Sequence, residues 1–183
     1  MNLLSTNNIY PQSYIRTRKL MFLALLTTFA LALHMLELSL PNPTPWLRLG
    51  LANIIILATL ALFGFKAGLA VNFLRIILGA FLSGSIFSPA FLMSFGGGLS
   101  SVLVMGLTLK LGKNIFSLIG VSVIGAYVHI LTQLWLAYWI LIQHPGIFSL
   151  LPLFLVISLL TGLINGLGAE ILKRQMEHLI GKA

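Results

Sequence analysis

The chain has 183 residues, of which 58% are hydrophobic and only 8% are charged, and its mean hydropathy is +1.04. Soluble globular domains carry about 25% charged residues, so this composition excludes a soluble protein and indicates an integral membrane protein. The formal net charge of +8 points to orientation in the membrane and is only weak support for nucleic-acid binding, so no nucleic-acid partner is expected. The chain has no cysteine, which excludes disulfides, thiolate nucleophiles, iron–sulfur clusters and cysteine zinc sites.

Apolar runs separated by glycine, proline and charged residues predict six transmembrane helices, because about 20 apolar residues are needed to cross the hydrocarbon core. The predicted helices cover residues 19–37, 50–65, 67–83, 89–110, 114–142 and 148–173. The expected fold is an all-α integral membrane protein, a six-transmembrane-helix bundle in which residues 1–183 form a single membrane domain. Its tails are residues 1–18, which lack the pattern of a cleaved signal peptide, and residues 174–183.

The basic residues of the predicted tails and connections lie almost entirely on one side of the membrane. They are Arg16, Arg18, Lys19, Lys66, Lys110, Lys113, Lys173, Arg174 and Lys182. Only Arg48 falls on the other side. By the positive-inside rule, both tails and both termini are therefore expected in the cytoplasm.

Arg75 is the charged residue that is predicted deepest in the membrane. It follows Lys66 by nine residues, which places it about 13 Å along the third helix. An arginine at this depth costs about 2.5 kcal/mol or more and is usually retained facing a cavity or a partner. Asn72, and Asn165 at a similar depth on the sixth helix, are candidate hydrogen-bond partners. Two interpretations remain: Arg75 is satisfied by carbonyls and amide side chains, or it binds an anionic or carbonyl-bearing ligand.

A second group of polar residues is predicted near the outer face of the membrane. The group comprises His34, Glu37, Asn53, His129 and Gln133. Spacings of three and four residues place His34 on one helix face with Glu37, and His129 on one face with Gln133. Together these residues are candidates to line an outward-opening substrate pocket. The alternative for each histidine is an interhelical hydrogen bond, and the spacing does not require a metal, so no metal site is predicted.

The first outer connection, residues 38–49, has three prolines in five residues and cannot be helical. Glu37 and Arg48 stand at its two ends and could pair across them. We therefore expect an ordered lid over the outer pocket. The alternative is a short, stiff loop without a ligand.

Clustered aromatic residues near the outer end of the fifth helix also have two interpretations. Trp135, Tyr138 and Trp139, together with Trp46, are typical of an interfacial aromatic belt. Alternatively, they offer a stacking surface for a flat ligand.

Glycines are frequent in the predicted helices. Small residues four positions apart predict close helix packing, and they occur at Gly64/Gly68, Gly97/Ser101 and Gly162/Gly166. The triple glycine at 96–98 would cost about 1 kcal/mol per glycine relative to alanine in a helix. It indicates either a break in the fourth helix or the close approach of a ligand.

Three segments carry a resemblance to a known family: LELSLPNPTPWLRLGLANIIIL, VNFLRIILGAFLSGSIFSPAFLMSFGGGLSS and GVSVIGAYVHILTQLWLAYWIL. They resemble the Gx transporter family, whose members are also labelled heptaprenyl diphosphate synthase component I. This family is similar to the S components of energy-coupling-factor (ECF) transporters of the bacterial cytoplasmic membrane. The resemblance implies six helices, both termini inside, and an outward-facing pocket capped by the first loop.

The resemblance also implies a docking face for a membrane coupling subunit, because S components dock through small residues on their first helix. Here Ala24, Thr28 and Ala32 repeat at a spacing of four, on a face about 120° away from His34. Ordinary packing within the chain is the alternative for this face.

Three functions remain open. The first is an S-component-like subunit that binds a small molecule from the outer side; the chain has no GxxxxGK[ST] loop, so separate ATPases would have to supply the energy. The second is a prenyl diphosphate synthase subunit, which would be non-catalytic because the chain has no aspartate and only three glutamates to hold Mg²⁺. The third is an accessory subunit of a flavin- or quinone-linked redox complex. No catalytic residue and no cofactor are predicted.

Overall fold

The computed structural model describes residues 12–39, 50–112 and 115–181. These residues contain no strand and form six α-helices: α1 (Gln12–Ser39), α2 (Ala52–Phe63), α3 (Phe65–Leu82), α4 (Pro89–Leu111), α5 (Leu118–Ala137) and α6 (Leu151–Gly181). A π-helical turn, η1 (Tyr138–Ile142), and a 3₁₀ helix, η2 (Pro145–Leu150), connect α5 to α6. The prediction of an all-α membrane protein is confirmed.

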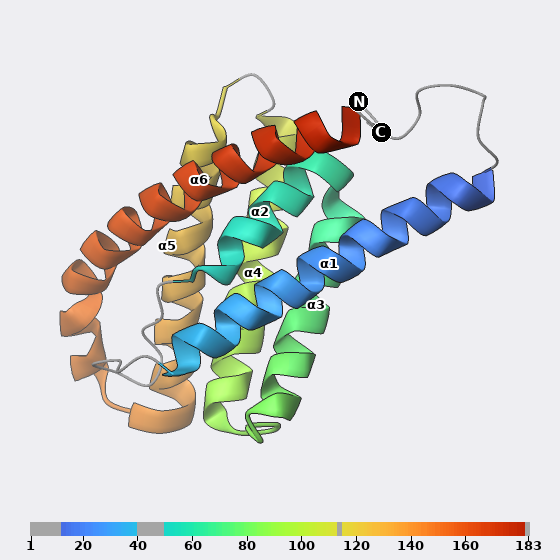
Figure 1. Cartoon of the computed structure of the whole chain (residues 1–183). Coiled ribbons are helices and arrows are strands. Elements are labelled where there is room, and N and C mark those ends of the chain that lie inside the picture. The colour runs from blue at the N-terminus through green and yellow to red at the C-terminus, as the bar shows by residue number, and fades with distance from the viewer. Residues whose placement is uncertain (1–11, 40–49, 113–114, 182–183) are drawn as a thin grey trace.

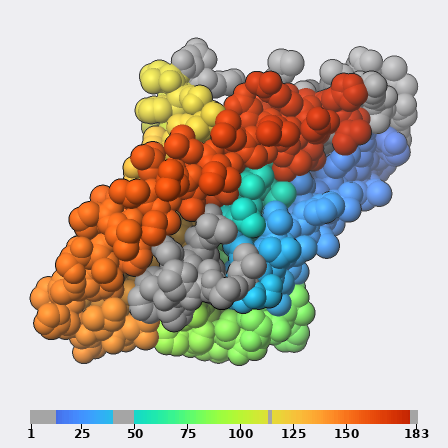
Figure 2. Space-filling model, turned by 60° about the vertical axis from the view of Figure 1, so that its left-hand side comes forward, coloured from blue at the N-terminus to red at the C-terminus, as the bar shows by residue number. Residues whose placement is uncertain are grey.

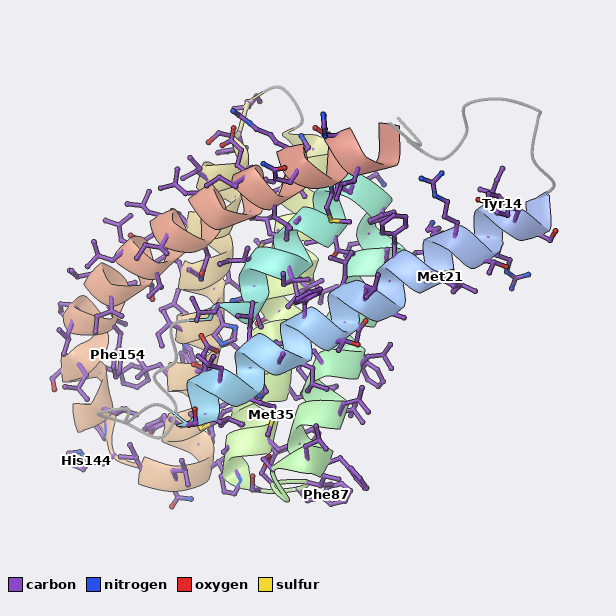
Figure 3. All side chains as sticks on the ribbon, in the orientation of Figure 1. Tyr14, Met21, Met35, Phe87, His144 and Phe154 are labelled. Carbon is purple, nitrogen blue, oxygen red and sulfur yellow. The ribbon has the colours of Figure 1, made fainter. Side chains whose placement is uncertain are left out.

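Successive helices run in alternating directions, as expected for a chain that crosses a membrane repeatedly (Figure 1). The start of α1, the α2–α3 turn, the α4–α5 connection and the end of α6 lie toward one end of the bundle. Lys66, Lys110 and Lys173 belong to these elements, and we call this the basic end. The α3–α4 turn with Phe87 and the α5–α6 connection with His144 lie at the far end (Figure 3).

Five of the six α-helices belong to segments that are long and apolar enough to cross a membrane: α1, α3, α4, α5 and α6. The second helix differs from the expectation of a crossing at 50–65. With 12 residues, α2 is about 18 Å long, which is less than the roughly 30 Å of hydrocarbon. Two glycines bound it: Gly50, with φ of +73°, precedes it, and Gly64, with φ of +84°, follows it. The helix therefore crosses only part of the bundle.

The outer helices are longer than the sequence predicted, and the fifth is shorter. α1 already begins at Gln12 and α6 continues to Gly181, so both enter the segments predicted as tails. The predicted helix 114–142 begins later, at Leu118, and its last five residues continue it as the π-helical turn η1. The connection predicted as non-helical at 38–49 begins later than expected, because Leu38 and Ser39 still belong to α1. Residues 40–49 lie outside the described parts of the chain, and with them the rest of the predicted lid, Arg48 and Trp46.

The short helix α2 lies in the interior and is packed against α1, α3, α4 and α6. Eight of its twelve residues are buried, and only a small patch of it is visible between α6 and α1 in the space-filling view (Figure 2). The exposed faces of the other helices carry large apolar side chains, among them Leu25, Phe29, Phe73 and Ile164. This arrangement places apolar surface where lipid would be and leaves the polar side chains inside.

Of the small-residue pairs singled out in the sequence, Gly162/Gly166 brings two helices close together, whereas Gly64 has no atom within 4 Å of the position of a Cβ. A Cβ on Gly162 would lie 2.8 Å from Cα of Val123, and one on Gly166 would lie 2.7 Å from Cα of Ile119. The backbone of α6 is therefore in direct contact with that of α5. The triple glycine does not break its helix, because α4 runs without interruption through 96–98.

Candidate functional site

A polar cavity lies inside the bundle, and all six α-helices contribute to its walls. Its volume is ≈ 40 Å³, room for a few water molecules. The lining residues are His34, Glu37, Gly50, Asn53, Arg75, Ser94, Ala126, His129, Ile130, Gln133, Ile157, Ser158, Thr161 and Asn165. Seven of them are residues that the sequence singled out, and they come from five different helices.

Glu37 binds the start of α2. Its Oε1 accepts a hydrogen bond of 2.6 Å from the backbone N–H of Leu51, the residue before the first turn of that helix. The first N–H groups of a helix have no partner within the helix and carry a partial positive charge, so a carboxylate is well placed there. The sequence suggested Arg48 as the partner of Glu37, and Arg48 lies outside the described residues. The backbone partner seen here could not be inferred from a pattern of charges.

His34 lies one turn before Glu37 and is packed against the backbone of α3. A Cβ on Gly79 would lie 2.7 Å from Cδ2 of the His34 ring, so only a glycine leaves room for the ring in this position. His34 and Glu37 are both buried, with 5% and 3% of their surface exposed. Both side chains line the cavity.

Arg75 is buried and donates a hydrogen bond from Nη2 to Oδ1 of Asn72, at 2.9 Å. Asn72 is the one predicted site residue that does not line the cavity, and its role in the structure is to accept this bond. A Cβ on Gly98 of α4 would lie 3.4 Å from Nη2 of Arg75 and 3.3 Å from Oδ1 of Asn72. Of the triple glycine, Gly98 therefore lies next to this pair, and it makes room chiefly for Ile76, 2.9 Å from such a Cβ, and for the Asn72 amide.

His129 and Gln133 reach the cavity from α5, next to the same glycines. A Cβ on Gly97 would lie 2.9 Å from Cγ of Gln133 and 3.2 Å from Nε2 of His129. Gly97 on α4 thus makes room for both side chains.

The amides of Asn53 and Asn165 meet at Gly50. A Cβ on Gly50 would lie 3.0 Å from Nδ2 of Asn53 and 3.4 Å from Nδ2 of Asn165. Gly50 precedes α2 by two residues, Asn53 lies in its first turn, and Asn165 belongs to α6. The short α2 therefore brings its polar first residues to the centre of the bundle.

Three polar residues of the cavity were missed by sequence reasoning: Ser94, Ser158 and Thr161. A signal for two of them was present, because Ser158 and Thr161 precede Asn165 by seven and four residues and thus share its helix face. Ser158 donates to the carbonyl of Phe154 at 2.7 Å, a common arrangement for a hydroxyl in an apolar helix.

The aromatic cluster lies outside the cavity walls. Trp135 contacts Tyr138 and Phe148 edge to face, and Tyr138 contacts Trp139 in the same way. Trp135 and Trp139 are largely exposed, and none of these four rings lines the cavity. Their position at the far end matches an interfacial aromatic cluster, and they do not form a stacking wall for a ligand in this cavity.

The cavity combines both signs of charge with neutral hydrogen-bonding groups. Arg75 supplies one positive charge, Glu37 supplies one negative charge, and amide, imidazole and hydroxyl groups supply donors and acceptors. Among the residues that the structure describes, no group of three or more His, Asp or Glu side chains could hold a metal ion. The arrangement can therefore orient a small polar molecule by hydrogen bonds from several helices.

The bond from Leu51 to Glu37 generates a stability prediction. Glu37→Ala leaves the Leu51 N–H without its acceptor inside the bundle, and we expect it to cost about 1–3 kcal/mol and to lower the melting temperature of the purified protein. Glu37→Gln retains an acceptor oxygen and should lie closer to the wild type. The control is Glu177→Ala, which removes only a surface pair with Lys173 at 3.7 Å and should have little effect. Equal melting temperatures for Glu37→Ala and Glu177→Ala would contradict the assigned role.

Comparisons with known proteins agree with this fold. The sequence profile of the family Heptaprenyl diphosphate synthase component I matches residues 26–172. A solved structure of the S component of a bacterial ECF transporter is similar to this chain, with a TM-score of 0.66 and 21% sequence identity over 90% of this chain and 98% of that one. No curated protein matches the chain. The matched region contains all the residues of the polar cavity, and the chain belongs to the Heptaprenyl diphosphate synthase component I family.

Proposed function

We propose that this protein is a substrate-binding membrane subunit that captures a small polar molecule from the outer side and takes part in its uptake. The observation that carries the proposal is the convergence of Arg75, Glu37, two histidines and three amides on one cavity inside an apolar bundle. Polar groups at such depth are costly, and they are usually retained in membrane proteins for a ligand or a transport path. The fold similarity to an S component supports the same class of function.

The cavity is too small for a vitamin-sized ligand in the conformation described, because ≈ 40 Å³ holds only a few waters. Binding therefore requires the helices around it to separate. We infer that α1, which carries His34 and Glu37, moves relative to α4 and to the closely packed pair α5 and α6. The proline-rich residues 40–49, which connect α1 to α2, would take part in this change as the predicted lid.

The charges of the cavity indicate the class of substrate. Arg75 favours an anionic or carbonyl group through its planar donors, whereas Glu37 is an acceptor for N–H or O–H donors of a ligand. A small molecule with a carboxylate or carbonyl at one position and a hydrogen-bond donor at another would match both. The apolar residues Ala126, Ile130 and Ile157 would contact its ring or hydrocarbon part.

A subunit of this kind needs partners for energy. The sequence has no phosphate-binding loop, so ATPases and a membrane coupling subunit would be separate chains. Ala24, Thr28 and Ala32 are all exposed along α1 and are available for docking to a coupling subunit. Thr28 Oγ1 donates to the carbonyl of Ala24 at 3.0 Å, so this face presents small, largely satisfied side chains to a neighbouring helix.

The proposed uptake requires the basic end to be cytoplasmic and the far end to face outward. The chain has no cysteine, so single cysteines can report on each end. We expect a membrane-impermeant maleimide to label His144→Cys in intact cells, and to label Gln175→Cys on the exposed end of α6 only after lysis. Labelling of Gln175→Cys in intact cells would refute the orientation.

Arg75 is expected to act on the ligand more than on stability. Arg75→Lys keeps the charge but loses the planar donors and should weaken retention of the ligand by about 1–3 kcal/mol. Arg75→Leu should abolish retention and leave the melting temperature unchanged or raised, because a buried charge is replaced by apolar packing. Mass spectrometry of small molecules released from gently purified protein gives the retention, and thermal unfolding gives the stability.

The matched control for Arg75 is Thr59→Val, a change at a fully buried polar residue of α2 that does not line the cavity. It should retain the ligand as the wild type does. If Arg75→Leu retains the ligand normally, or if its loss of ligand only follows a loss of folded protein, the role of Arg75 in binding is wrong.

The family label favours a second candidate, a non-catalytic membrane subunit of a prenyl diphosphate synthase. A catalytic role in that reaction would need clustered carboxylates for Mg²⁺, and the described glutamates are apart: Glu37 lies in the cavity, whereas Glu170 and Glu177 pair with basic residues on α6. An accessory role in a flavin- or quinone-linked redox complex is a further variant of the same idea.

Proteins that copurify with the chain from its native membrane distinguish these candidates. Capture of a membrane coupling subunit together with ATPases is expected for the proposed uptake function. That capture should be lost in Thr28→Leu, which places a bulky side chain on the small-residue face of α1. Capture of a prenyl diphosphate synthase or an oxidoreductase without any ATPase would favour the accessory role and contradict the proposal.

A further inference from the structure

A second hollow lies at the basic end, away from the polar cavity. It is a groove of ≈ 1040 Å³ between α2, α4, the starts of α3 and α5, and Lys173 of α6. Its walls are mainly apolar and include Leu60, Leu103, Leu107 and Phe116. It shares no lining residue with the polar cavity, so it is a separate feature of the molecule.

The groove is lined by apolar residues along its depth and by lysines at its rim. Leu103 and Lys110, both on α4, are seven residues apart, so the apolar wall extends about 10 Å from the lysine toward the middle of the bundle. Lys173 of α6 is the other lysine in the lining. Phe65 is seated against Gly106, where a Cβ would collide with its ring, and this contact shapes the groove on the α3 side.

The charge at the rim is positive. No carboxylate is among the described residues that line the groove. Lys173 lies 3.7 Å from Glu177, a half-exposed pair that compensates part of its charge. Lys110 has no ion pair among the residues that the structure describes. The rim therefore retains an excess positive charge next to an apolar wall.

We propose that this groove binds an anionic phospholipid, with an acyl chain along the apolar wall and the phosphate group at Lys110 and Lys173. An apolar groove at the side of a bundle is filled by hydrocarbon in a bilayer, because water gains no hydrogen bonds there. An ammonium at the level of the headgroups selects an anionic phosphate over a zwitterionic headgroup. Along the membrane normal, the acyl chain then lies beside the apolar wall, and the phosphate lies at the level of the two lysines.

The selectivity can be measured in nanodiscs made from equal parts of phosphatidylglycerol and phosphatidylcholine. Native mass spectrometry after release should show that the wild type retains phosphatidylglycerol in preference. Lys110→Gln should reduce the preference about fivefold, the effect of one lysine at an anionic membrane surface. The double variant with Lys173→Gln should bring the ratio of the two lipids close to that of the disc.

Lys66→Gln is the matched control, because Lys66 is exposed at the same end of the bundle and does not line the groove. It should keep the wild-type preference. Ala61→Phe fills the groove from α2 and should lower the retention of both lipids. Equal retention of the two lipids by the wild type, or an equal loss in Lys66→Gln and Lys110→Gln, would overturn the proposal, provided that each variant gives a wild-type melting temperature.

Photocrosslinking identifies the occupant directly. Leu107 lines the groove and is 55% exposed, and Leu107→Cys would be the only thiol in the chain. With a benzophenone attached to this cysteine, irradiation in the native membrane should add the mass of a phospholipid, and phosphatidylglycerol should predominate. Adducts with a second protein alone would assign the groove to a protein partner and refute the lipid site.

Discussion

The hydrocarbon core offers no water, so polar groups inside this bundle must be satisfied by the protein itself or by the few waters that the polar cavity can hold. The start of α2 shows what this requires. The helix begins in the interior, and the carboxylate of Glu37 on α1 accepts the hydrogen bond of the Leu51 N–H there. The same constraint pairs Arg75 with Asn72 on α3. Each polar group thus has to lie where its hydrogen-bond partner is. The polar residues therefore gather in one place in the bundle and are not scattered along the helices.

Gathering these polar residues in one cavity lowers the free energy of unfolding of the bundle. A loss of stability of this kind indicates a functional site. An apolar bundle would be simpler to fold without Arg75, Glu37 and their neighbours, because buried charges often stabilise less than apolar packing of the same volume. Residues that lower the stability of the fold are typical of functional sites. The apolar surroundings also strengthen any hydrogen bond that a ligand makes in the cavity, since few competing water molecules are present.

The sequence predicted much of the fold because its strongest signals are local. Apolar runs identify α1, α3, α4, α5 and α6, and spacings of three and four residues place His34 with Glu37 and His129 with Gln133. The shortness of α2 was not predicted, because an interior helix in a membrane protein is as apolar as one that crosses the bilayer.

The contacts between helices also could not be predicted from the sequence. The acceptor role of Glu37 depends on where the Leu51 backbone lies, and the position of a backbone N–H group cannot be inferred from residue types. Ser158 and Thr161 were overlooked because hydroxyls in apolar helices usually bind their own backbone, as Ser158 does. The triple glycine was correctly recognised as unusual, but its effect depends on which helices pass beside α4.

The triple glycine makes α4 a thin spacer between α3 and α5. Successive helical positions differ by about 100°, so three glycines in a row remove side chains from most of the helix circumference at one level. Gly98 lies against Arg75 on one side, and Gly97 lies against His129 on the other. A methyl group on Gly97 would press on Gln133 and His129 of α5, whereas one on Gly98 would press on Ile76 and Asn72 of α3. The lack of side chains at these positions thus lets side chains of α3 and α5 approach the backbone of α4 closely.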